Sequence, residues 1–165
     1  MTTSEAEIRI RPIRPSDDAG LAAIIRTVMS EFEAIGAGFS IEDPEVDSMS
    51  QAYAAEDSVY LVAEVGGRLV GGSGIGRLAD ADGEVCELRK MYLLPEARGL
   101  GVGKRLLEAS LNAARERGYR TCYLETLGHM DRARRLYESF GFRPLDAPLG
   151  NTGHFGCNRW YAMPL

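Results

Sequence analysis

Hydrophobic residues recur along this chain at two spacings, every second position in some segments and every third or fourth position in others. The first spacing is typical of a strand with one buried face, and the second of an amphipathic helix. In the first half of the chain, these spacings predict a strand over 7–13, a helix from Pro15 to about Ile35, a short helix over 44–55, and strands over 58–65 and 68–76. Because Gly66 and Gly67 lie between the last two strands, we expect these strands to form a hairpin.

The second half of the chain follows the same two spacings. They predict a strand over 84–94, a helix from Gly101 to Arg117, a strand over 119–126, a helix over 130–140, and strands over 142–145 and 155–163. The inward stripe of the first of these helices comprises Val102, Leu106, Leu107, Ser110, Leu111 and Ala114. The order of elements, β-α-α-β-β-β-α-β-α-β-β, predicts a mixed α/β fold rather than a purely alternating doubly wound sheet.

The length of 165 residues predicts a single domain over 1–165. Hydrophobic residues make up 45% of the chain and charged residues 26%, as in ordinary globular proteins. The formal net charge of −5 argues against nucleic acid or an anionic membrane as the main partner, because both favour a basic surface. A basic substrate fits this sign, and so does simple solubility.

The N-terminus has neither the basic start nor the apolar core of a signal peptide, and no stretch approaches the ~18 apolar residues of a membrane span. We therefore expect a cytoplasmic protein. The three cysteines, Cys86, Cys122 and Cys157, form no closely spaced pair, and only His129 and His154 could join them at a metal. We expect neither a disulfide framework nor a metal site.

Residues 98–103 read RGLGVG and lie between the strand predicted over 84–94 and the helix that begins at Gly101. Glycines let the backbone approach an anion closely, and the first N–H groups of a helix are unpaired and point at it. The helix dipole adds about half a positive charge at the same place. This segment therefore predicts a phosphate-binding turn, with a glycine-rich turn that binds no ligand as the alternative.

Three phosphate-binding patterns can be compared with this segment. A P-loop, G-x-x-x-x-G-K-[ST], is matched at Gly103 and Lys104, but Arg98 replaces its first glycine and no Ser or Thr follows Lys104. The dinucleotide pattern G-x-G-x-x-G fails at Lys104, and the similar string over 74–79 precedes a turn rather than a helix. The pattern [Q/R]-x-x-G-x-[G/A] is matched by Arg98, Gly101 and Gly103.

This third pattern is the pyrophosphate loop of the GNAT superfamily of N-acetyltransferases, which the chain also resembles in ELRKMYLLP over 87–95 and in LYESFGF over 136–142. The resemblance covers about residues 8–164. It implies a central mixed, mostly antiparallel twisted sheet with helices on both faces and a splay between the two central strands. It also implies acetyl-CoA as co-substrate and direct transfer of the acetyl group to a primary amine of a small molecule or peptide.

The sequence departs from the family pattern in two places. Many members carry Asn three positions before Ala133, where it contacts the pantetheine; this chain has Met130 there, which puts that contact in doubt. The segment over 153–161 differs from the common family tail, and we interpret it as a candidate wall of the substrate pocket.

The resemblance also implies a set of cofactor contacts. A backbone N–H near 91–93 is expected to stabilise the oxyanion of the tetrahedral intermediate. Arg98 is expected to contact the pyrophosphate, with a solvated loop arginine as the alternative. The predicted cofactor-binding residues are Met91, Tyr92, Leu93, Arg98, Gly99, Leu100, Gly101, Val102, Gly103 and Lys104.

Two catalytic residues are predicted. Tyr137, on the inward stripe of the helix over 130–140, is the candidate general acid for the leaving thiolate of CoA; its alternative role is a core tyrosine bonded to a carbonyl. Glu87 is the candidate that binds or deprotonates the acceptor amine, because a carboxylate in an apolar strand needs a partner or a function. The alternative for Glu87 is an ion pair with Arg89. Glu125 is the second candidate base, and His154 could shape the acceptor site.

Two other functions remain open on the sequence alone. The same fold could bind acyl-CoA as a sensor without turnover. A phosphate-binding NTPase would need the Ser or Thr and the acidic metal ligands that the loop lacks. The acceptor amine is not determined by the sequence, and a homodimer is also left open because exposed edge strands in such folds often pair.

Overall fold

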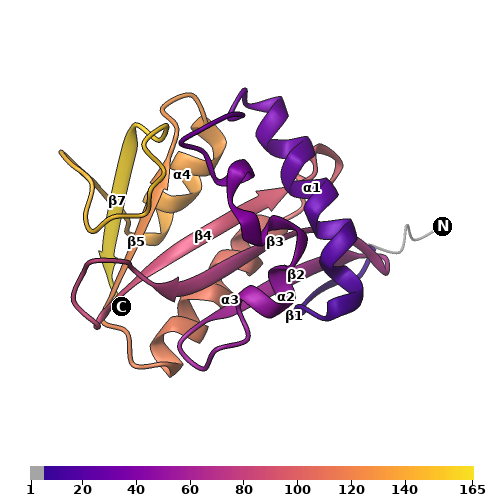
Figure 1. Cartoon of the computed structure of the whole chain (residues 1–165). Coiled ribbons are helices and arrows are strands. Elements are labelled where there is room, and N and C mark those ends of the chain that lie inside the picture. The colour runs from indigo at the N-terminus through magenta and orange to yellow at the C-terminus, as the bar shows by residue number, and fades with distance from the viewer. Residues whose placement is uncertain (1–5) are drawn as a thin grey trace.

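A seven-stranded sheet in the order β1-β2-β3-β4-β5-β7-β6 forms the centre of the computed structural model, which describes residues 6–165 (Figure 1). The strands are β1 (Ile8–Pro12), β2 (Val59–Val65), β3 (Arg68–Arg77), β4 (Val85–Leu93), β5 (Thr121–Thr126), β6 (Arg143–Leu145) and β7 (Arg159–Pro164). The α-helices are α1 (Asp18–Glu31), α2 (Met49–Ala52), α3 (Val102–Glu116) and α4 (Asp131–Phe140). Short 3₁₀ turns cover Pro15–Asp17, Ser40–Glu42, Pro44–Asp47 and Pro95–Ala97.

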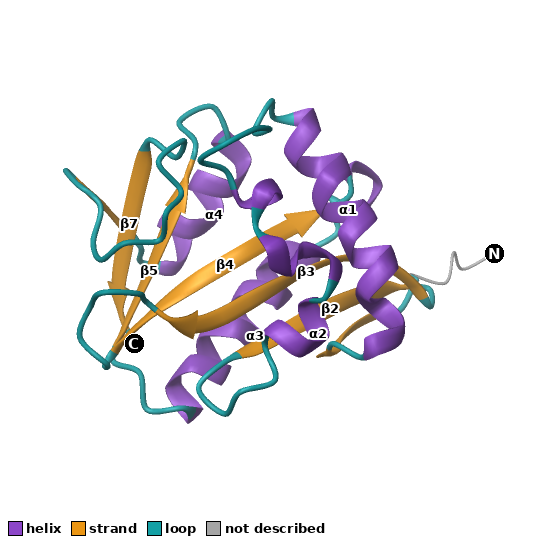
Figure 2. Cartoon of the chain, in the orientation of Figure 1, coloured by secondary structure: helices purple, strands orange, loops and turns teal. Residues whose placement is uncertain are grey.

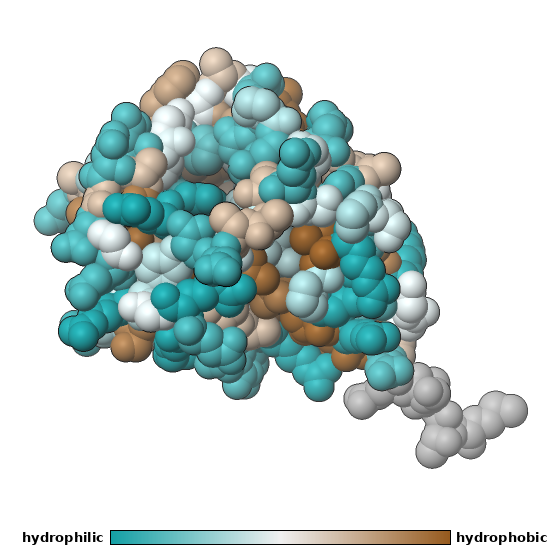
Figure 3. Space-filling model, turned by 60° about the horizontal axis from the view of Figure 1, so that its bottom comes forward, coloured by the Kyte–Doolittle hydropathy of each residue, from teal (hydrophilic) through white to brown (hydrophobic). Residues whose placement is uncertain are grey.

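The helices cover both faces of this sheet. Helices α1 and α2 lie on one face, and α3 and α4 lie on the other (Figure 2). The predicted stripe of α3, from Val102 to Ala114, is buried at every one of its six positions. The surface seen in Figure 3 is mostly polar, with hydrophobic side chains visible in small patches. None of the helices within residues 6–165 is both long and apolar enough to cross a membrane.

The two central strands, β4 and β5, separate from one another along their length. They are the parallel neighbours in the sheet and pair only between Val85–Glu87 and Thr121–Tyr123, although β4 continues to Leu93 and β5 to Thr126. The other neighbouring strands pair antiparallel. The predicted fold class is therefore confirmed, including the splay between the central strands, and the splay leaves room for a site inside the sheet.

A bulge in β4 accompanies this separation. Lys90 has a φ of 47°, in the left-handed region, and the pairing of β3 with β4 shifts register between Gly72 and Gly74. The hydroxyl of Tyr60 donates a hydrogen bond to the carbonyl of Lys90 at 2.7 Å. Bulges redirect the backbone groups beside them, and the pairing of β4 with β3 resumes at Tyr92 and Leu93, among the predicted site residues.

Three predicted boundaries were wrong. Helix α1 ends at Glu31 rather than near Ile35, because Glu33 adopts a φ of 57° and Ala34 donates its N–H back to the carbonyl of Met29 at 2.8 Å. The helix predicted over 44–55 is a 3₁₀ turn followed by the single turn α2. The last strand begins at Arg159, and the segment 155–158 before it is a loop that reaches the functional site.

Candidate functional site

A groove of about 660 Å³ lies beside the end of β4, between the N-terminus of α3 and helix α4. Residues of both helices, of β4 and of the loop before α3 line it. They include Met91, Tyr92, Leu93, Arg98, Gly99, Gly101, Gly103, Lys104, Met130, Arg132, Leu136 and Tyr137. The structure therefore places eight of the ten predicted cofactor residues on one groove; the other two, Leu100 and Val102, alternate with the glycines, Leu100 exposed and Val102 buried.

The loop before α3 has the conformation of an anion-binding turn. Gly99 and Gly101 have φ values of 79° and 83°, which L-residues rarely adopt, and Gly101 is the N-cap of α3. No side chain caps α3, and no acidic residue occupies its first turn. The first N–H groups of this helix and its dipole are thus available to an anion in the groove.

The positive charge around this loop differs in part from the prediction. Lys104 lines the groove, but both terminal nitrogens of Arg98 bind the carboxylate of Glu31, at 2.6 and 2.8 Å. The Arg98 guanidinium also lies 5.4 Å from the centre of the Phe32 ring. Arg98 thus ties the end of α1 to the loop while remaining on the groove wall.

Arg132, in the first turn of α4, is a groove residue that sequence reasoning missed. One of its terminal nitrogens would lie 3.9 Å from a Cβ added to Gly99. The run of basic residues at the start of α4, Arg132, Arg134 and Arg135, was the signal that could have identified it.

An inner cavity of about 60 Å³ continues from the groove into the splay. The two share Met91, Tyr92, Met130 and Tyr137 as lining residues. An outer cavity of about 220 Å³ adjoins the inner one on its other side and shares Glu87, Arg89, Lys90 and His154 with it. The three spaces therefore lie next to one another across the sheet, with these shared side chains between them.

Tyr137 lies where the groove meets the inner cavity. The residue is 7% exposed, and its hydroxyl has no hydrogen-bond partner among residues 6–165. Burial raises the pKa of Tyr137 well above its ordinary value, with the nearby Cys122 as a minor cause, so the phenol stays protonated at neutral pH. The alternative of a core tyrosine bonded to a carbonyl does not describe this hydroxyl.

Glu87 lies on β4 inside the splay, and its side chain is 7% exposed. Nε of Arg89 donates to one carboxylate oxygen of Glu87 at 2.7 Å, so the ion pair considered from the sequence is present. Burial raises the pKa of Glu87 above its ordinary value, and Arg89 opposes that shift. On the neighbouring strand, Glu125 accepts hydrogen bonds from the hydroxyls of Tyr123, at 2.6 Å, and Thr152.

Two loops close the outer side of these spaces, and sequence reasoning did not foresee their contacts. Lys90, whose side chain is only 2% exposed, places its Nζ 2.6 Å from carboxylate oxygens of both Asp43 and Glu45. Nε2 of His154 lies 2.9 Å from the carboxylate oxygens of Asp43. Asp43 thus joins the loop after α1 to β4 and to the loop before β7.

The same two loops also interlock through aromatic rings and glycines. A Cβ on Gly38 would lie 2.6 Å from the ring of Phe155, and a Cβ on Gly156 would lie 2.6 Å from the ring of Phe39. The N–H of Gly156 donates to the carbonyl of Gly38 at 2.9 Å. His154 and Cys157 of the segment over 153–161 line the inner cavity, and the role of this segment as a wall of the substrate pocket stays a prediction.

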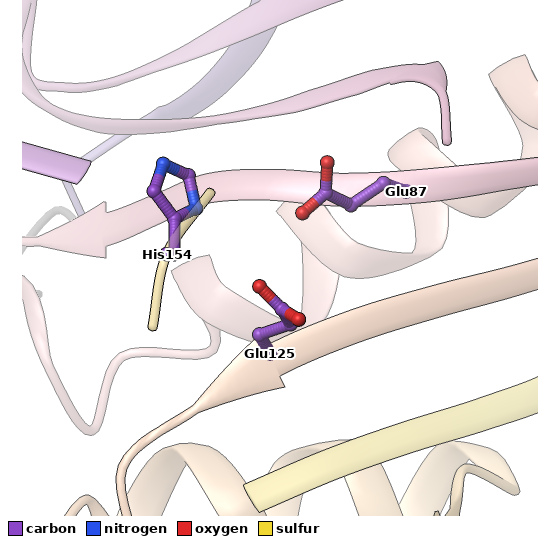
Figure 4. Close-up of side chains that lie close together, drawn as sticks. All are labelled: Glu87, Glu125 and His154. Carbon is purple, nitrogen blue, oxygen red and sulfur yellow. The ribbon is translucent and has the colours of Figure 1, made fainter. Parts of the chain in front are cut away.

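Glu87, Glu125 and His154 lie close together (Figure 4), and all three line the inner cavity. Each offers one ligand-type atom, and these atoms all lie within 4.8 Å of one another. Cys157 also lines the inner cavity, and burial raises the pKa of its thiol to about 12, which leaves it a neutral packing group.

Comparisons with known proteins point to one family. The family model described as the acetyltransferase (GNAT) family matches residues 22–142. An uncharacterized N-acetyltransferase of Escherichia coli K12, YjgM, is 39% identical over 149 residues, which span 90% of this chain and 89% of that protein.

Solved structures agree in fold. A GNAT-family acetyltransferase of Staphylococcus aureus Mu50 superposes with a TM-score of 0.79 at 23% identity, over 96% of this chain and 99% of that one. YncA of Salmonella typhimurium, described as a putative acetyltransferase with its cofactor acetyl-CoA, has a TM-score of 0.74 at 22% identity, over 96% of this chain and 92% of that one.

Proposed function

The chain belongs to the GNAT acetyltransferase family and is an N-acetyltransferase, and from this premise we propose that it transfers the acetyl group of acetyl-CoA directly to a primary amine of a small molecule or peptide. The observation that carries the proposal is the hydroxyl of Tyr137, a residue only 7% exposed that lines both the groove and the inner cavity and whose oxygen has no protein partner among residues 6–165 and stays accessible. A hydroxyl in that position faces both a ligand in the groove and a ligand in the splay.

The groove suits the coenzyme in shape and charge. Its 660 Å³ lies within the range of ~300–1,000 Å³ found for small-molecule sites. The N–H groups at Gly101–Gly103, with Lys104 and Arg132, would hold the diphosphate. Met130 lies where the family's asparagine contacts pantetheine, and its thioether offers only a weak acceptor there. The structure of the Salmonella relative with acetyl-CoA supports the same ligand.

Acetyl transfer to an amine makes three chemical demands. An amine with a pKa of about 10.4 is neutral only about once in 2,500 molecules at pH 7, a deficit of about 4.6 kcal/mol, so a group must accept its proton. We assign Glu87 to bind or deprotonate this amine. A backbone N–H of 91–93, beside the bulge at Lys90, would stabilise the oxyanion. Tyr137 would protonate the leaving thiolate.

The size of the outer cavity limits the part of the acceptor that enters. At about 220 Å³ it is smaller than typical pockets for drug-sized ligands, so it encloses the amine end of the acceptor and little more. The rest of the molecule would extend past Glu45 and Thr152 to the surface.

We predict that the protein releases free CoA thiol from acetyl-CoA when a suitable primary amine is present. A thiol-detection assay with a panel of diamines, amino acids and short peptides measures this release, with each amine omitted in turn as the control. The sensor alternative predicts that CoA binds but that no amine in the panel raises thiol release above the background, and that result would contradict the proposal.

A further inference from the structure

Three hydrogen-bond acceptors face one another at the inner cavity, and two of the three residues also line the outer cavity. They are carboxylate oxygens of Glu87 and Glu125 and a ring nitrogen of His154, all within 4.8 Å of one another (Figure 4). The Glu87 carboxylate is more than nine-tenths buried and points into the gap between them. Three acceptors around an open space require a donor-rich ligand.

A primary ammonium group has the geometry for this space. It carries three N–H donors in a tetrahedral arrangement. Three acceptors placed about 2.8 Å from such a nitrogen lie about 4.6 Å from one another, which falls inside the 4.8 Å observed here. An ammonium would also offset the two negative charges, of which that of Glu87 is already paired with Arg89.

His154 differs from the two carboxylates because its hydrogen bond with Asp43 fixes which of its ring nitrogens carries a hydrogen. Asp43 accepts hydrogen bonds from both His154 and Lys90, which hold the pKa of Asp43 below its usual range although burial opposes them. An ionised carboxylate can only accept, so Nε2 of His154 carries the hydrogen. In the neutral imidazole Nδ1 is then a lone-pair acceptor, and Figure 4 shows a ring nitrogen on the side that faces Glu87.

We propose that Glu87, Glu125 and His154 bind the primary ammonium group of the acceptor, and that His154, held by Asp43, is the base that takes its proton. The proposal rests on the proposed function and decides between the two roles left open for Glu87, which becomes the ammonium ligand. We refer to the three residues as the ammonium tripod.

The proton balance is complete with groups of this chain. The ammonium gives one proton to Nδ1 of His154, while Nε2–H remains on Asp43. The freed amine attacks the thioester carbon, so that a C–N bond forms and the C–S bond breaks. Tyr137 gives its proton to the sulfur and recovers one from the nitrogen of the new amide. His154 returns its proton to water through the outer cavity.

The charges around His154 raise its pKa above the ordinary value. The titratable and charged groups that face it are Asp43, Glu87, Lys90, Arg89, Glu125 and Cys157. Burial would lower the pKa of His154, but the hydrogen bond and the charge of Asp43 outweigh burial and raise it above its ordinary 6.5. A raised pKa makes His154 a stronger base toward the bound ammonium than an ordinary histidine.

The first test compares kcat across pH for the wild type and His154→Gln at saturating acceptor. We expect kcat of the variant to be about 100-fold lower at pH 7, and this ratio to shrink as pH rises and the bound amine loses its proton to water. A loss of the same size at every pH would indicate a merely structural role, and an unchanged kcat would remove the base; either outcome overturns the proposal. His129→Gln is the matched control, because His129 is exposed and lines none of the three spaces, although it contacts the carbonyl of Phe32 in the groove wall.

The second test does not depend on turnover. The chain has two histidines, so ¹⁵N-labelled histidine gives two ring systems, and His154→Gln assigns them. We expect neutral His154 to carry its hydrogen on Nε2; the Nδ1–H form would overturn the proposal. Activity that is lost on chelation and restored by Zn²⁺ would assign the tripod to a metal and also overturn it.

The two proposals fail in different ways. If wild-type protein releases no thiol with any amine, the proposed function itself is wrong. If the wild type is active but Glu125→Gln leaves KM for the acceptor unchanged, where we expect a rise of about 10-fold, the ammonium tripod is wrong and the acetyltransferase assignment stands.

Discussion

Replacing Tyr137 by phenylalanine is expected to lower kcat for acetyl transfer by about 100-fold, within the range known for proton transfer by a positioned acid. The substitution removes a hydroxyl that bonds to nothing within residues 6–165, so the fold and the affinity for CoA should change little. Steady-state kinetics with CoA titrations on both proteins measure the two effects separately.

Tyr119→Phe is the matched control for this change. Its hydroxyl donates to the carbonyl of Asp57 at 2.6 Å, away from the groove and both cavities, so the variant loses a hydrogen bond without losing a catalytic group. Its kcat should equal that of the wild type. Unchanged turnover in Tyr137→Phe would remove Tyr137 from the mechanism.

Glu87→Gln is expected to lower kcat/KM for the acceptor by about 100-fold, mostly through KM. The substitution removes the charge that attracts the ammonium and leaves Arg89 without its ion-pair partner, and charged hydrogen bonds of this kind contribute about 1.5–3 kcal/mol each. Glu84→Gln is the control, because Glu84 is exposed and lies just before the same strand.

The pH dependence of KM gives the same prediction an independent check. Because burial raises the pKa of Glu87, the carboxylate is protonated at a higher pH than an exposed glutamate would be, and ammonium binding is lost as pH falls through that pKa. KM of the wild type should therefore rise toward acid pH through an ionisation above the ordinary glutamate value. The same rise in Glu87→Gln would show that another group controls it.

The regular parts of the fold were predictable because their signals are local. The stripe of α3 and the glycines at 66–67 each fix an element within a few neighbouring residues. The splay between β4 and β5 was different: no pattern in either strand encodes it, and it came from the resemblance to a family. The early end of α1 depends on the left-handed backbone conformation of Glu33. Glutamate is not a helix-breaking residue, so the sequence does not indicate an end of the helix at this position.

The candidate site was predictable on the coenzyme side and not on the acceptor side. The loop over 98–103 and Tyr137 belong to contiguous motifs, so their meeting at one groove could be expected. Asp43 and His154 are separated by 111 positions and lie in irregular loops, where side-chain contacts follow from the packing of Gly38 and Phe155 rather than from any periodicity. The sequence identified His154 only as a possible wall of the pocket for that reason.

Calorimetric titration of CoA into the intact protein tests most directly whether the turn before α3 binds the coenzyme's diphosphate through backbone N–H groups. The account predicts a saturable heat with one site per chain, and at least ~10-fold weaker binding of pantetheine, which lacks the diphosphate. Absence of any heat from CoA at millimolar concentration, or equal affinity for pantetheine and CoA, would contradict it.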